Sequence, residues 1–222
     1  MKRLAVFAVL PVALCFCIAS SLAQAEDKLK MSFNNEEITK IIEVYAKASG
    51  QKFVVDPAVR GKVSIFLPDN VSLEEAYNQL SSALAINGFG VSKQGDTLIV
   101  KSARNIQRDL IEVSTTKPTV VPERMYTWIY TAQNISASDI NRDLRILTSK
   151  DGELSVHEST NQLIVTDWTS NIIRISEILK EIDKKVDPSI AKLVEASKKE
   201  RETRVKAMVI KKDGEKMLKS EN

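Results

Sequence analysis

Alternating and helically spaced apolar residues predict a run of short elements over residues 26–114. Leu29, Met31 and Phe33 alternate with Lys30 and Ser32, which is typical of a half-buried strand. Further strands are predicted at 52–55, 63–67, 89–93 and 97–101, the last two as a hairpin. Helical spacing predicts one helix from Ile38 that Gly50 ends and another through Leu80 that Gly88 ends. The predicted order is β-α-β-β-α-β-β.

Polar residues mark the start of both helices. Asn34 or Asn35 can cap the first, with Glu36 and Glu37 in the first turn, where acids interact favourably with the helix dipole. The second begins with a capping box, Ser72-Leu73-Glu74-Glu75.

Residues 124–185 predict a second unit with the order β-α-β-β-α. A strand over 124–130 is followed by a helix capped by Ser136, two strands at 153–157 and 162–167, and a closing helix. The closing helix carries its apolar residues at helical spacing: Ile172, Ile175, Ile178, Leu179 and Ile182. Both units are of the α+β class, with helices expected on one face of a short sheet. The second order is also KH-like, but the GXXG clamp of nucleic-acid-binding KH domains is absent from 123–185.

Prolines divide the chain further. Pro118 and Pro122 lie in a Thr- and Val-rich stretch, residues 115–123, which predicts a mobile linker between the domains at 26–114 and 124–185. Pro188 opens a charged tail, 186–222, for which we expect a fraying helix whose pattern breaks at Lys211–Gly214. A partner-binding amphipathic helix is the alternative for this tail.

The first 25 residues have the features of a secretory signal peptide. Lys2 and Arg3 precede a short apolar run, and Ala23-Gln24-Ala25 is an A-x-A cleavage site before Glu26. Residues 1–25 are therefore expected to be removed, which leaves a periplasmic protein without a membrane span of its own. An uncleaved anchor is the alternative, but the apolar run is shorter than the ~20 residues of a spanning helix.

Composition excludes several classes of function. Hydrophobic residues make up 43% and charged residues 27% of the chain, which excludes wholesale disorder. Cys15 and Cys17 are the only cysteines and His157 the only histidine, so we expect no disulfide framework, no metal site and no cofactor. The net charge of +3 falls to +1 without Lys2 and Arg3, which argues against a nucleic-acid partner.

Residues that could carry chemistry have simpler structural roles. His157 lies at a strand end with no G-x-S-x-G motif elsewhere, so we expect a solvent-facing histidine rather than a catalytic one. Tyr126, Trp128 and Tyr130 share one strand face, and we expect core packing rather than a stacking platform for sugars or bases. No enzyme activity is therefore predicted.

Several motifs together resemble the N-terminal periplasmic domains of secretins, the outer-membrane channels of type II secretion and type IV pilus systems. Val54–Val63 reads V-V-D-P-A-V-R-G-K-V, and Thr160–Asp167 reads T-N-Q-L-I-V-T-D. The motif residues are Val55, Asp56, Pro57, Val59, Gly61, Thr160, Asn161 and Leu163. The first unit resembles the first secretin N-domain, and 124–183 resembles the NolW-like second domain.

The resemblance implies a docking or ring component that binds other secretion or pilus proteins, including an inner-membrane platform or a secretin ring. Secretins continue into a pore domain, and 186–222 shows no alternating pattern for one, so we expect a role without pore formation. The alternatives are a truncated or split secretin, or a signalling module like that of TonB-dependent receptors. The system served, and whether the protein forms a homo-oligomer, stay open.

A candidate partner-binding edge lies at the predicted first strand. Leu29, Lys30, Met31 and Phe33 form a short terminal strand, and an exposed strand edge can accept a strand from a partner. The alternative is that neighbouring residues cover this edge.

Cleavage of the signal peptide is directly testable. We expect export to remove residues 1–25, because Ala25 ends an A-x-A site after a short apolar run. Mass spectrometry of the exported protein should then show Glu26 as the first residue. A retained Met1 would contradict the prediction.

Overall fold

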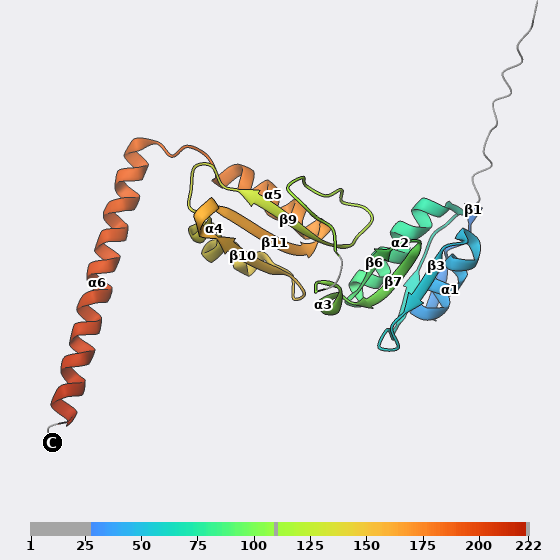
Figure 1. The fold of residues 1–222 in the computed structure, drawn as a ribbon, viewed down its shortest axis with the longest axis horizontal. Helices are drawn as coiled ribbons and strands as arrows, with labels where there is room; N and C mark the ends of the chain where they lie inside the picture. The colour runs from blue at the N-terminus through green and yellow to red at the C-terminus, as the bar shows by residue number, and fades with distance from the viewer. Residues whose placement is uncertain (1–27, 109–110, 221–222) are drawn as a thin grey trace, which may run out of the picture.

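The computed structural model describes residues 28–108 and 111–220, and the surroundings of side chains up to residue 208. Two small α+β domains lie next to each other, and a long helix follows the second (Figure 1). The predicted signal peptide and its cleavage site at Ala25 and Glu26 lie outside the described residues.

The first domain contains three small sheets and two main helices. Its elements are β1 (Lys28–Leu29), β2 (Phe33–Glu37), α1 (Ile38–Ser49), β3 (Lys52–Val55), β4 (Lys62–Ile65), β5 (Val71–Ser72), α2 (Leu73–Ile86), β6 (Phe89–Gln94), β7 (Thr97–Ser102) and α3 (Ala103–Ile106). β7 is the central strand of a three-stranded sheet, parallel to β3 and antiparallel to β6. β2 pairs with β4, and β1 pairs with β5. The predicted hairpin is confirmed, with Gly95 at φ 58° in its turn.

Two predictions at the start of this domain are wrong. Residues 29–33 do not form one strand, because the chain turns inward at Met31, whose side chain is completely buried in the core. Asn34 and Asn35 do not cap α1, and Glu36 and Glu37 do not lie in its first turn. All four residues belong to β2, where Asn35 takes a left-handed conformation at an irregularity in the β2–β4 ladder.

The D-P motif organises the turn that follows β3. The Asp56 carboxylate accepts a hydrogen bond from the Ala58 amide at 2.8 Å, and Val59 inserts into the core. Gly61 has φ 134°, and a Cβ there would lie 3.2 Å from the Asn87 side chain, so a larger residue is disfavoured. Its carbonyl accepts a hydrogen bond from the Ile38 amide at the start of α1. The motif therefore connects this turn to α1.

The second domain is a four-stranded sheet with helices on one face. Its elements are β8 (Val113–Ser114), β9 (Met125–Thr131), α4 (Ala137–Leu144), the 3-10 turn η1 (Arg145–Leu147), β10 (Glu153–His157), the 3-10 turn η2 (Glu158–Thr160), β11 (Gln162–Trp168) and α5 (Thr169–Ile182). The strand order is β10-β11-β9-β8, and only the β8–β9 pair is parallel. Apolar residues of α4 and α5 share one core with Tyr126, Trp128, Leu163 and Val165 of the sheet.

Asn161 of the T-N motif joins the turn after η2 to the segment between β9 and α4. It takes a left-handed conformation at φ 52° after η2. Its side-chain oxygen accepts a hydrogen bond from the Ala137 amide at 2.7 Å, and its amide donates to the carbonyls of Ala132 and Ile135. Its neighbour Thr160 contacts His157, and Leu163 is completely buried.

The predicted linker is not a free connector. The first domain ends with α3 at Ile106, and Val113–Ser114 already pairs with β9 of the second domain. The Trp128 indole donates to the Thr115 carbonyl at 3.1 Å, and the Tyr126 hydroxyl donates to the Thr116 carbonyl at 3.1 Å. Residues 115–123 therefore lie along the second domain, because its aromatic residues supply donors for their carbonyls.

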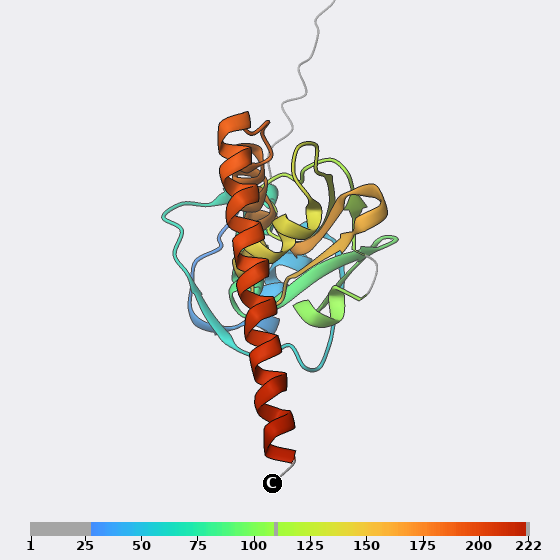
Figure 2. The same ribbon diagram turned by 90° about the vertical axis from the view of Figure 1, so that its left-hand side faces the viewer.

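The tail forms one helix, α6 (Pro188–Ser220), which projects beyond both domains (Figure 2). The predicted break at Lys211–Gly214 is absent, because the helix continues through these residues.

Replacing Asn161 tests the loop connection. Asn161→Ala removes three hydrogen bonds from partly buried partners and should lower the free energy of unfolding by roughly 2–3 kcal/mol. Asn35→Ala is the matched control, because Asn35 has the same φ of 52° but an exposed side chain. Urea unfolding should show a smaller decrease in the free energy of unfolding for Asn35→Ala than for Asn161→Ala. Equal decreases would mean that the left-handed backbone conformation, rather than the side-chain hydrogen bonds, explains the effect.

Candidate interaction site

The predicted partner-binding edge is only partly available. Leu29 pairs with Val71, and Phe33 pairs with Ile65 in a different sheet. Met31 is completely buried, whereas Lys30 is exposed. Among the described residues, β1 has a neighbouring strand on one side only, so its other side remains the candidate edge.

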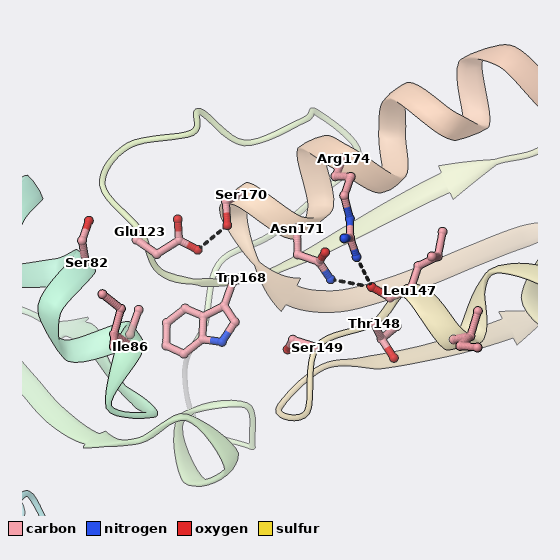
Figure 3. Close-up of a pocket in the computed structure, with 12 residues that line it drawn as sticks. Ser82, Ile86, Glu123, Leu147, Thr148, Ser149, Trp168, Ser170, Asn171 and Arg174 are labelled. Atoms are coloured by element: carbon pink, nitrogen blue, oxygen red, sulfur yellow. Dashed lines mark hydrogen bonds between the residues drawn. The ribbon is translucent and has the colours of Figure 1, made fainter.

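A groove at the boundary of the two domains is a second candidate, which the sequence did not reveal. It has a volume of about 510 Å³ (Figure 3). The first domain contributes Ser82, Ala85 and Ile86 from α2. The second contributes the loop around Leu147, Trp168 at the end of β11, and the first turns of α5.

The two most exposed large apolar side chains in the part of the chain that the structure describes lie on this groove. Ile86 is 82% exposed and comes from α2, while Ile146 is 86% exposed and comes from η1. Trp168, which is only 8% exposed, lies between the two domains (Figure 3). Exposed apolar residues gathered at one groove indicate a protein-binding surface.

Hydrogen bonds fix the polar wall of the groove. Arg174 and Asn171 donate to the Leu147 carbonyl at 2.7 and 3.0 Å. The Ser170 hydroxyl donates to Glu123 at 2.8 Å, and burial raises the pKa of the Glu123 carboxyl. The wall is therefore preorganised, since its polar groups already have partners.

Asp167 positions the loop that borders the groove. Its buried carboxylate accepts hydrogen bonds from the amide and hydroxyl of Ser149, and from Asn171. The backbone of Gly152 approaches so closely that a Cβ there would lie 2.4 Å from the carboxylate. A glycine is therefore required at this position.

A small apolar cluster joins the two domains beneath the groove. Ala103 and Ile106 of α3 pack with Met125 and Trp168, and Ala85 and Ile111 lie against them. Gly90 of β6 lets this cluster form, because a Cβ there would lie 3.1 Å from Ile106 and 3.7 Å from Trp168. A hydrogen bond from Gln107 to Glu153, at 3.2 Å, also crosses the boundary.

The remaining candidates for chemistry have structural partners. The Nδ1 atom of exposed His157 lies 2.7 Å from the Thr160 hydroxyl. Tyr126 and Trp128 are buried, while Tyr130 donates to Asp183. Within the described ranges there is no group of three or more potential metal ligands among His, Cys, Asp and Glu.

Comparison with known proteins assigns each domain. Residues 31–100 match the GspD-like N0 domain, and residues 127–187 match the short domain of bacterial type II/III secretion systems. The chain is 29% identical to secretin XcpQ of Pseudomonas aeruginosa over 73% of its own length and 24% of that protein. It is 28% identical to the putative secretin GspD of Escherichia coli over 68% of its length and 24% of that protein. The chain thus spans about a quarter of the curated relatives it matches.

A solved structure agrees with these matches. It is described as the Klebsiella pneumoniae type II secretion system outer membrane complex with PulD, PulS and the PulC HR domain. The alignment has a TM-score of 0.62 and 26% identity, and covers 70% of this chain and 27% of the other.

The role of Gly90 can be tested by substitution. Gly90→Val should separate the domains, because the new side chain would collide with Ile106. Limited proteolysis with mass spectrometry should then show faster cleavage within 107–112. Gln94→Val, an exposed position on the same strand, should leave the cleavage rate unchanged. If the Gly90→Val variant and the control variant resist the protease equally well, the proposed contact between the two domains is contradicted.

Proposed function

Since this chain carries the N-terminal domains of the secretin family, we propose that it acts as a periplasmic docking or ring component of a type II-like secretion system. The proposal rests mainly on one observation, the presence of both N-domains in the secretin order along one chain. The match to PulD within an outer membrane complex supports a role among other secretion proteins. A type IV pilus system is the alternative setting.

Periplasmic localisation rests on the predicted signal peptide and on the relatives. One matched structure is a type II secretion system outer membrane complex that contains PulD. The described residues contain no helix with the length and apolar character needed to cross a membrane.

Function would then consist of protein–protein contact. We assign the principal contact to the groove between the domains, where Ile86 and Ile146 offer apolar surface beside a wall of fixed polar groups. A partner from the secretion machinery would insert an apolar side chain between them, as binding hot spots commonly do. The open side of β1 remains a second docking position, available for strand addition.

Capture from a periplasmic extract tests this function. The immobilised chain should retain secretion-machine proteins identified by mass spectrometry, and Ile86→Asp with Ile146→Asp should abolish capture. Both residues are more than 80% exposed, so the fold should be kept. Phe66→Asp is the matched control, since Phe66 is 72% exposed but does not line the groove.

The outcomes separate the two surfaces. If Lys30→Pro abolishes capture while the variant with Ile86→Asp and Ile146→Asp still captures its partners, docking is assigned to the edge at β1. Failure of the unmodified chain to retain any secretion or pilus protein would overturn the proposed function.

A further inference from the structure

The turn between η1 and β10 carries two charged side chains that face the first domain. A Cβ on Gly88, just after α2, would lie 3.6 Å from the Lys150 ammonium. A positive charge beside the C-terminal end of a helix is favourable. The next residue, Asp151, faces Arg104 of α3, with 3.9 Å between the Asp151 Oδ1 atom and the Arg104 Nε atom. The boundary between the domains therefore contains charged contacts in addition to the apolar cluster.

Asp151 is the least satisfied of these charged groups. Its side chain is only 10% exposed, and its buried Oδ2 atom has no hydrogen-bond partner. The backbone of the next residue, Gly152, touches the carboxylate of Asp167, so a second and completely buried acid lies close to the turn. Burying a carboxylate is costly unless positive charge compensates it. Asp151 therefore requires a cation nearby.

Arg104 supplies this positive charge from the other domain. At 3.9 Å the two groups are too far apart for a hydrogen bond, but opposite charges at this distance attract each other. The Arg104 side chain is 78% exposed, so it contributes its charge to the contact rather than its packing. Because Arg104 and Asp151 belong to different domains, their attraction holds the two domains together.

The same turn borders the groove between the domains. Ser149 lines the groove, and so does Ile146 three residues before it. On the opposite wall, Ile86 ends α2 two residues before Gly88. A shift of the turn away from the first domain would therefore change the separation of Ile86 and Ile146.

We propose that Arg104 and Asp151 are positioning residues whose attraction across the domain boundary fixes the width of the groove. Their importance for partner binding rests on the function proposed above, whereas the width is a property of the chain alone. The two charges are not equivalent. Without Arg104 the buried Asp151 carboxylate is uncompensated, and it gains water only when the turn leaves the boundary. Without both charges this cost is absent, so the groove should keep its width.

Distance measurement by pulsed electron paramagnetic resonance tests the proposal. Ile86→Cys and Ile146→Cys provide two exposed sites for nitroxide labels, and the chain from Glu26 onward contains no other cysteine. The labelled chain should give one narrow distance distribution. Arg104→Ala in this background should give a broader distribution with a longer mean distance, and the further change Asp151→Asn should restore the narrow one.

Arg108→Ala is the matched control, because it removes an exposed arginine four residues further along the chain. This variant should leave the distance distribution unchanged. Circular dichroism should show that all variants are folded, since the side chain of Arg104 is largely exposed.

Three outcomes would overturn the proposal. An unchanged distribution in Arg104→Ala would mean that the apolar cluster alone fixes the groove. If Arg104→Ala with Asp151→Asn gives a distribution as broad as Arg104→Ala alone, Arg104 does not act by compensating Asp151. An equally broad distribution in Arg108→Ala would mean that any loss of positive charge in this region has the same effect.

Capture from a periplasmic extract separates this proposal from the proposed function. With Ile86 and Ile146 unchanged, Arg104→Ala should retain less of the secretion-machine proteins than the unmodified chain, and adding Asp151→Asn should restore their capture. If the unmodified chain captures no such protein, the proposed function fails, while the measured distances still decide the role of Arg104 and Asp151.

Discussion

The arrangement of this protein depends on the apolar contact between Trp168 and Met125 of the second domain and Ile106 of the first. The contact exists because Gly90 leaves room for it, so a residue without a side chain sets the distance between the domains. The groove at the boundary then follows, since Trp168 belongs both to the contact and to the groove wall.

Polar side chains position the parts of the second domain that apolar packing leaves free. Asp167 holds the loop beside the groove, Asn161 connects η2 with the segment before α4, and Asp183 connects the end of α5 with residues 133–134. Burial acts to raise the pKa of Asp183, but hydrogen bonds from Tyr130, Gln133 and Asn134 outweigh it and lower the pKa. The charged form of Asp183 is therefore favoured in the folded state.

Most elements could be predicted from the sequence because their residues repeat with a clear period. The helix that begins after Ser136 and the hairpin around Gly95 are examples in which cap, turn and pattern agree. Prediction failed where a local signal competed with tertiary packing: Met31 continues an alternating pattern but enters the core, and Asn34 and Asn35 look like caps but lie in β2. The groove could not be predicted, because Ile86 and Ile146 belong to different domains and no pattern in the chain connects them.

The parallel pairing of β8 with β9 sets where the second domain can be separated from the first. A fragment beginning at Arg124 would contain every helix of that domain, yet it would lack the edge strand and the carbonyls of Thr115 and Thr116. The indole of Trp128 and the hydroxyl of Tyr126 would then lose their acceptors, which destabilises a small domain out of proportion to the residues removed. The hydrogen-bonded unit of the second domain therefore starts no later than Glu112, whose carbonyl accepts a hydrogen bond from the Thr127 amide at 2.9 Å, and dissection of the protein should cut between Ile106 and Glu112.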